Sequence, residues 1–143
     1  MPAKFILITA PAKINLYLGV HNERDEAGYH RVDSVMTAID LVDTIAVAPA
    51  DELSVHMVPE ADFPMEANTA YKAAVAMGKV FDREPNFAIL IDKHIPVRAG
   101  LGGPSTDAAA TIMGICHYWK IDPMDPRIEA VARGIGADVP FFL

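Results

Sequence analysis

Residues 96–110 read Pro96-Val-Arg-Ala-Gly-Leu-Gly-Gly-Pro-Ser-Thr-Asp-Ala-Ala-Ala110, a glycine-rich stretch between two regular segments. An apolar run at 87–91 precedes it and predicts a strand, and the alanine-rich run that follows predicts a helix. Glycine lets a backbone approach an anion closely, and a helix start offers unpaired N–H groups at the positive end of the helix dipole. We therefore expect a phosphate-binding loop at 96–104, with Ser105 capping the next helix.

The rest of the chain predicts an α+β domain with a mixed sheet. Alternating apolar residues favour strands at 5–9, 12–20, 32–39, 44–48 and 53–58, with a charged loop at 21–30. Within 12–20 the alternation places Lys13 and Asn15 on one polar face. Apolar residues at helical spacing predict helices from Asn68 to Phe81, over 105–119 and over 127–135, and the apolar end at 139–143 predicts a final strand.

The composition is that of one ordinary domain with a packed core. The chain has 143 residues, of which 52% are hydrophobic. No window reaches the about 18 uncharged apolar residues of a membrane helix. The net charge of -7 argues against a nucleic-acid partner and requires any anion site to be local. The single cysteine, Cys116, fits a reducing cytoplasm.

Three interpretations of the glycine loop compete. A Walker A loop needs Lys and then Ser or Thr after its last glycine, whereas Pro104 follows Gly103. A dinucleotide fingerprint needs a third glycine or alanine where Ser105 stands, and it follows the first strand of its unit. A glycine turn that binds nothing is the remaining structural alternative.

Four motifs together suggest a family. The loop motif Pro96-x-x-x-Gly-Leu-Gly-Gly-x-Ser-x-Asp-Ala-Ala-Ala110 resembles the ATP loop of the GHMP kinase superfamily. Pro11-Ala-Lys-Ile-Asn-Leu16, Gly28-Tyr-His30 and Gly136-Ala-Asp-Val-Pro-Phe141 resemble segments of its 4-diphosphocytidyl-2-C-methyl-D-erythritol kinases, in the same order. The resemblance implies the ribosomal protein S5 domain 2-like fold, with helices on one face of the sheet. It also implies phosphorylation of the 2-hydroxyl of a cytidine-diphosphate-linked methylerythritol, in the non-mevalonate route to isoprenoids.

The same resemblance implies two catalytic residues. Asp138 would be the base that takes the proton of the substrate hydroxyl, which is a role typically worth ~10²–10⁴-fold in rate. Lys13 would lie beside Asp138 and stabilise charge near the transferred phosphoryl group. Without the motifs, Asp138 is better explained as a turn residue after a helix, and Lys13 as a solvated lysine on a strand, which is the common outcome for a lone lysine.

The implied ATP contacts gather on the loop and at one helix start. They are Pro96, Gly100, Leu101, Gly102, Gly103, Ser105, Thr106 and Asn68, the last as the adenine contact, although Asn68 is equally well explained as a helix cap. The loop departs from the family at two places. Pro104 stands where relatives usually have glycine, so one N–H donor is missing. Thr106 stands where they usually have serine.

The implied substrate contacts are Asn15, Tyr29 and His30. Tyr29 would stack on the cytosine and His30 would hydrogen-bond to it. ATP and Mg²⁺ are the expected cofactors, with no metal ligand named in this chain. The expected partner is the small-molecule substrate, with no nucleic acid and no membrane.

Family members are much longer and have two domains. We therefore expect residues 1–143 to match the N-terminal ATP-binding domain, with the C-terminal domain absent. One alternative function is a catalytically inactive nucleotide-binding domain, which would form a homodimer through its exposed C-terminal strand. Another is a GHMP kinase for a different small alcohol, such as homoserine or mevalonate.

Overall fold

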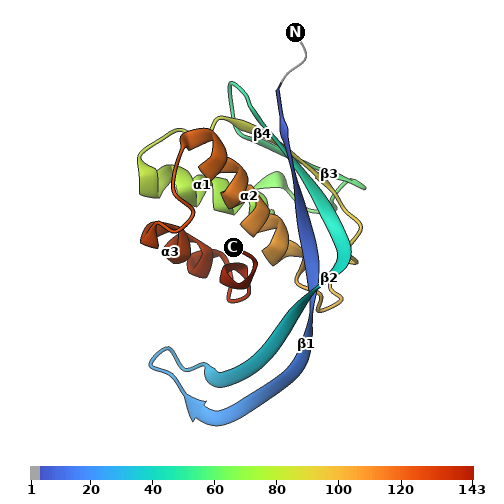
Figure 1. The fold of residues 1–143 in the computed structure, drawn as a ribbon, viewed down its shortest axis with the longest axis vertical. Coiled ribbons are helices and arrows are strands. Elements are labelled where there is room, and N and C mark those ends of the chain that lie inside the picture. The colour runs from blue at the N-terminus through green and yellow to red at the C-terminus, as the bar shows by residue number, and fades with distance from the viewer. Residues whose placement is uncertain (1–3) are drawn as a thin grey trace.

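A computed structural model describes residues 4–143 as one sheet with helices packed against it (Figure 1). The elements follow in the order β1 (Ile6–Arg24), β2 (His30–Pro49), β3 (Ser54–Val58), η1 (Met65–Ala67), α1 (Thr69–Phe81), β4 (Phe87–Asp92), α2 (Gly103–Trp119), α3 (Pro126–Ile135) and η2 (Val139–Phe142). No helix in this range is long and apolar enough to cross a membrane.

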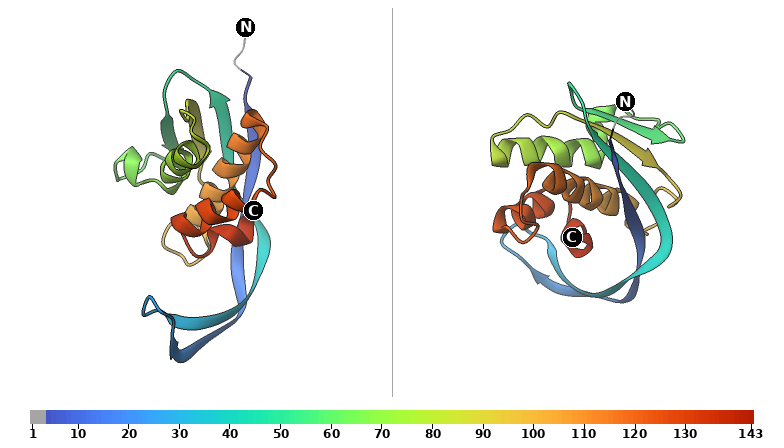
Figure 2. Two further views of the ribbon diagram at one scale, coloured as in Figure 1. Left: turned by 90° about the vertical axis from the view of Figure 1, so that its left-hand side faces the viewer. Right: turned by 45° about the horizontal axis from the view of Figure 1, so that its top comes forward.

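The sheet is mixed and has the strand order β1-β2-β4-β3. β1 pairs with β2 and β2 with β4 in antiparallel fashion, whereas β3 runs parallel to β4. A parallel pair needs a crossover, and here η1 and α1 supply it. β1 and β2 extend well beyond the other strands as a curved arm (Figures 1 and 2). Register shifts in this pair fall at Pro11/Lys13, Asn15/Tyr17 and Val20/Arg24, and such bulges bend and twist a ribbon.

The helices cover one face of the sheet, and the core lies between the two layers (Figure 2). α2 lies nearest to the strands at Gly114, where an added Cβ would stand 2.9 Å from both Ile8 Cδ1 and Val47 Cγ2. The inner faces of β2 and β4 pack against α1 and α2 to form the core. Their fully buried apolar side chains include Ile45, Val47, Ile89, Ile91, Ile112 and Ile115.

The α+β class, the mixed sheet and the three helices are confirmed, but several boundaries differ. The strands expected at 5–9 and 12–20 form the single strand β1, and those at 32–39 and 44–48 form β2. Half of the charged stretch 21–30 lies in the strands, and residues 25–29 turn between them. Charged residues are found in these strands because both faces of the arm are exposed to solvent. They therefore do not indicate a loop here.

The strand expected at 139–143 is wrong. These residues form η2, a short 3-10 helix with Pro140 in its first turn. Proline suits a helix start and lacks the N–H that a strand ladder needs. Val139 in this turn is fully buried, whereas Phe141 and Leu143 are 39% and 40% exposed, so burial accounts for only part of the apolar composition. The C-terminal strand edge that would support a homodimer is therefore absent from the fold.

Candidate functional site

The glycine loop connects β4 to α2 through three residues in the left-handed region. Arg98 has φ 57°, while Gly100 and Gly102 both have φ 74°. α2 begins at Gly103 with Gly102 as its N-cap, and no side chain caps it. The cap expected at Ser105 is wrong, because this residue already lies in the first turn of the helix. The first N–H groups of α2 thus have no side-chain acceptor, which is the arrangement that binds anions at helix starts.

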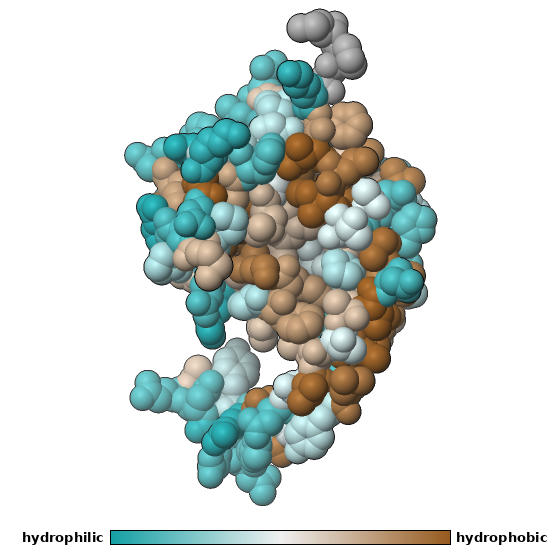
Figure 3. Space-filling model, in the orientation of Figure 1, coloured by the Kyte–Doolittle hydropathy of each residue, from teal (hydrophilic) through white to brown (hydrophobic). Residues whose placement is uncertain are grey.

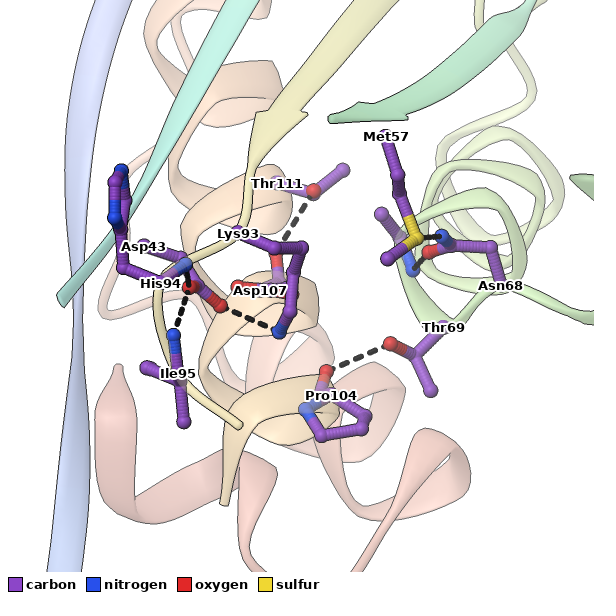
Figure 4. A network of polar contacts seen from close by, with 11 residues as sticks. Asp43, Met57, Asn68, Thr69, Lys93, His94, Ile95, Pro104, Asp107 and Thr111 are labelled. Atoms are coloured by element: carbon purple, nitrogen blue, oxygen red, sulfur yellow. Dashed lines mark hydrogen bonds and ion pairs between the residues drawn. The ribbon is translucent and has the colours of Figure 1, made fainter. Parts of the chain in front are cut away.

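Pro104 fits the first turn of α2, where its missing N–H interrupts no helical hydrogen bond. Its carbonyl oxygen accepts a hydrogen bond of 2.7 Å from Thr69 Oγ1 at the start of α1 (Figure 4). The substitution therefore removes one donor from the loop without disturbing the helix. It also leaves the two helix starts tied together.

The N-terminal and C-terminal motifs meet beside this loop. Lys13 is 6% exposed, and its Nζ lies 3.1 Å from Asn15 Oδ1 and 3.9 Å from Asp138 Oδ2. The Lys13 backbone N–H donates to Leu101 O at 2.9 Å. Asp138 lies between α3 and η2, with its side chain 40% exposed. The expected closeness of Lys13, Asn15 and Asp138 is thus present, and their catalytic and substrate roles stay predictions.

Close packing joins this cluster to the loop. A Cβ added to Gly102 would lie 3.0 Å from Lys13 Cγ and 3.1 Å from Phe142 Cζ. A Cβ at Gly136 would lie 3.8 Å from Ser105 Oγ. The absence of a Cβ at Gly102 lets β1, the loop and η2 approach one another, whereas a Cβ at Gly136 would make ordinary van der Waals contact. An ammonium, a carboxylate and an uncapped helix start are therefore gathered in one place.

Tyr29 and His30 lie apart from this cluster, at the end of the β1–β2 arm (Figure 1). Tyr29 is 74% exposed, and the Asp25 carboxylate holds the turn by accepting from the Ala27 and Tyr29 N–H groups. His30 Nδ1 lies 2.9 Å from the His21 carbonyl oxygen, which can only accept a hydrogen bond. The arm curves back towards the helices and leaves an open hollow between them (Figure 3).

A cavity of about 250 Å³ opens on the other side of the loop. Most of its exposed wall is apolar and comes from Met57, Phe63, Ala67, Val97 and Pro104. The polar members are Asn68, Thr69, Lys93, Arg98 and Asp107. A larger open hollow of about 600 Å³ lies near Leu53, Tyr71 and Arg83, away from the loop. The smaller cavity adjoins the glycine loop through Arg98 and Pro104, whereas no residue of the loop lines the larger hollow.

Asn68 stands at the entrance of α1 and borders this cavity. Its Oδ1 accepts from the Ala70 N–H at 2.9 Å, and its Nδ2 lies 3.0 Å from Met57 Sδ (Figure 4). Its role as the N-cap of α1 is confirmed. An adenine contact stays a prediction, and the cavity position is what supports it.

Sequence reasoning missed a buried charge cluster behind the loop, formed by Asp43, Lys93 and Asp107 (Figure 4). Lys93 Nζ lies 2.6 Å from Asp43 Oδ2 and 3.0 Å from Asp107 Oδ2. Asp43 Oδ1 accepts from the His94 and Ile95 N–H groups at 2.7 and 2.8 Å. The cluster therefore joins β2 to both ends of the loop. A charged residue inside the apolar strand β2 was the available signal.

Burial and hydrogen bonding set the protonation of this cluster. Burial raises the pKa of Asp107, and the neighbouring Asp43 raises it further, to about 8, although Lys93 opposes this. Burial also acts on Asp43, but its hydrogen bonds outweigh it and lower the pKa of that carboxyl. Burial disfavours the Lys93 ammonium, yet the two carboxylates outweigh it and raise its pKa. Asp107 is thus the member that holds a proton near neutral pH.

The comparisons with known proteins agree with this geometry. The family model for the GHMP kinases N terminal domain matches residues 68–143, which is more than half of the chain and includes the loop and Asp138. This chain belongs to the GHMP kinase family. A 4-diphosphocytidyl-2-C-methyl-D-erythritol kinase of Rhodococcus jostii is 40% identical over 141 residues, covering 96% of this chain and 45% of the relative. One of Listeria monocytogenes is 43% identical over 138 residues, covering 95% and 47%.

Solved GHMP kinase structures share the fold. The crystal structure of a 4-(cytidine 5'-diphospho)-2C-methyl-D-erythritol kinase matches with a TM-score of 0.78 and 35% identity, over 96% of this chain and 48% of that one. A mevalonate kinase matches with a TM-score of 0.70 and 20% identity, over 91% and 46%, which shows the fold alone. This chain spans about half the length of the relatives it matches.

Proposed function

We propose that this chain is the ATP-binding part of a kinase that phosphorylates the 2-hydroxyl of 4-diphosphocytidyl-2-C-methyl-D-erythritol. The observation that carries the proposal is the meeting of Lys13, Asn15 and Asp138 beside Leu101 of the glycine loop. Segments from both ends of the chain build this arrangement around one loop. The named relatives at about 40% identity favour this substrate over homoserine or mevalonate.

In this proposal the phosphates of ATP lie against the loop and the start of α2, and the adenine enters the cavity beside Asn68. The backbone N–H groups of α2, none bonded to a capping side chain, supply the donors. ATP with Mg²⁺ would be the phosphoryl donor, because phosphoryl transfer relies on charge neutralisation and alignment. Within residues 4–143 no group of three acidic, histidine or cysteine side chains could hold a metal ion. No step is therefore assigned to a metal held by this chain alone.

Asp138 would accept the proton of the substrate hydroxyl, and Lys13 would stabilise the negative charge on the transferred group. Asn15 would contact the substrate from its position beside Lys13, whose Nζ donates to Asn15 Oδ1. Tyr29 and His30 would hold the cytosine across the hollow in Figure 3. Because the His21 carbonyl oxygen requires a proton on His30 Nδ1, a neutral His30 would present Nε2 as an acceptor, which suits an amino group.

The test is phosphoryl transfer from ATP, measured with and without the substrate. Asp138→Asn should lower turnover by ~10²–10⁴-fold while ATP still binds. Asp51→Asn, an exposed change far from the loop in sequence, is the matched control and should leave turnover unchanged. Equal turnover in the wild type and Asp138→Asn would refute the assigned base.

A second candidate is nucleotide binding without transfer. It is favoured by the uncapped start of α2 and the cavity beside Asn68, because the groups that would bind a nucleotide there all belong to this chain. A loosely placed substrate can cost ~10²-fold or more in rate. ATP binding without turnover, in the presence of the substrate, would select this candidate over the first.

A further inference from the structure

The buried cluster of Asp43, Lys93 and Asp107 carries a charge imbalance next to the cavity. The side chains of Asp43, Lys93 and Asp107 are 0%, 7% and 4% exposed. Lys93 Nζ contacts both carboxylates, so the fully ionised cluster holds two negative charges and one positive charge. A net charge in such a buried place is costly, and retaining one proton removes it.

The geometry indicates where the proton resides. Asp43 receives more donors than Asp107, because it accepts from Lys93 and from two backbone N–H groups. Asp107 accepts only from Lys93, and its Oδ1 is buried with no hydrogen-bond partner among the residues that the structure describes. A carboxyl with an unpaired buried oxygen is stabilised less as an anion than its neighbour. The raised pKa of Asp107 and the lowered pKa of Asp43 agree with this.

Few other charges face Asp107. Asp43 comes from β2 and Lys93 from the end of β4, and Arg98 of the glycine loop lines the same cavity. α1 contributes the neutral Asn68 and Thr69 to this wall. From β1, Lys13 is engaged by Asn15 and Asp138 instead.

Lys93 and Asp107 form part of the cavity wall, and α2, which carries Asp107, begins at the proposed phosphate site. We propose that the Asp43–Lys93–Asp107 cluster holds one proton on its Asp107 carboxyl, and that ATP binds tightly only to this protonated form. This inference rests on the proposed function. Its physical reason is that deprotonation places a net negative charge between the cavity and the helix start that receives a polyanion.

ATP binding should therefore weaken as the pH rises. With one required proton and the pKa of about 8 for Asp107, the dissociation constant for ATP should rise about tenfold from pH 7 to pH 9. Calorimetry at pH 8 in buffers of different ionisation enthalpy should show uptake of about half a proton on binding. The phosphates of ATP add little to this uptake, because phosphate groups lose their last proton near about pH 6.

Asp107→Asn replaces the carboxyl by a neutral amide of the same shape. It should flatten the pH profile and abolish proton uptake, and it should bind ATP more tightly than the wild type at pH 9. Asp40→Asn, an exposed change on the same strand as Asp43, should keep the wild-type profile. A wild-type dissociation constant that stays constant from pH 7 to pH 9, without proton uptake, would overturn the coupling and leave the proposed function intact.

A second measurement uses the wild type alone, so it needs neither a nucleotide nor a variant. Carbon-13 NMR of the carboxyl groups in the wild type should show one buried aspartate titrating well above pH 6. A midpoint below pH 6 for every aspartate would overturn the proton held by Asp107. If ATP fails to bind at every pH to both the wild type and Asp107→Asn, the proposed function is refuted, and the coupling with it.

Discussion

Gly102 and Gly100 offer a comparison in which only the surroundings of a side chain differ. Both have φ 74°, so alanine at either position would adopt the same left-handed conformation. Nothing lies within 4 Å of a Cβ added to Gly100. A Cβ added to Gly102 would instead meet Lys13 Cγ at 3.0 Å and Phe142 Cζ at 3.1 Å.

The backbone conformation should cost each variant about 1–2 kcal/mol of unfolding free energy. Gly100→Ala should lose no more than this. Gly102→Ala should lose an additional ~1–3 kcal/mol, because the loop, the Lys13 stem or the Phe142 ring must shift to admit the methyl group. The expected extra loss corresponds to a fall in Tm of about 2–4 °C for each kcal/mol.

Urea unfolding followed by circular dichroism measures both free energies. Gly28→Ala, also at a positive φ with nothing within 4 Å, is a second control at the tip of the arm. If Gly102→Ala and Gly100→Ala lose the same free energy, the close contact between the loop, Lys13 and η2 is refuted. The same result would remove the packing argument that places Lys13 at the loop.

Three further outcomes are expected. Asp43→Ala should lower the unfolding free energy by about 2–5 kcal/mol, because it leaves two backbone N–H groups and Lys93 short of an acceptor, while Asp40→Ala should change it by less than about 0.5 kcal/mol in the same urea titration. Gly114→Ala should destabilise by ~1–3 kcal/mol through contact with Ile8 and Val47, whereas Gly134→Ala, in a helix with nothing within 4 Å, should stabilise by about 0.4–1 kcal/mol; a gain at Gly114 would contradict the helix–sheet distance. The raised pKa of Asp107 means that its favourable contribution is complete below its unfolded pKa of 3.8 and is lost as the pH rises towards about 8, so the stability of the wild type relative to Asp107→Asn should fall across this range.

The parts of the fold that were predictable are those with local signals. Apolar periodicity gave the three helices, and Asn68 was recognised as a helix cap from its residue type and position. The strand predicted at 139–143 was wrong because apolar residues suit a 3-10 turn as well as a strand. Residue type alone therefore does not separate the two. The four short strands merged for a related reason, since exposed polar positions in a long hairpin look like breaks in the pattern.

The residues of the candidate site were predictable where a family motif named them. They were not predictable where only the three-dimensional fold brings them together. The motifs placed Lys13 and Asp138 together, and the structure has them 3.9 Å apart. The cluster of Asp43, Lys93 and Asp107 joins residues 64 positions apart at its extremes, 43 and 107, and no local pattern encodes such a contact. The prediction that Ser105 caps α2 was wrong, because the positive φ of Gly102 allows the helix to begin earlier.

The hydrogen bond from the Lys13 N–H to the Leu101 carbonyl oxygen, 2.9 Å long, joins the backbone of β1 directly to the backbone of the glycine loop. Lys13 belongs to the strand β1, whose far end forms the arm, and Leu101 belongs to the loop that would cradle the phosphates. A loop displacement that kept this hydrogen bond would therefore move the Lys13 backbone as well. The same strand continues from Lys13 to the far end of the arm, where the turn carries Tyr29 and His30 pairs with Arg24.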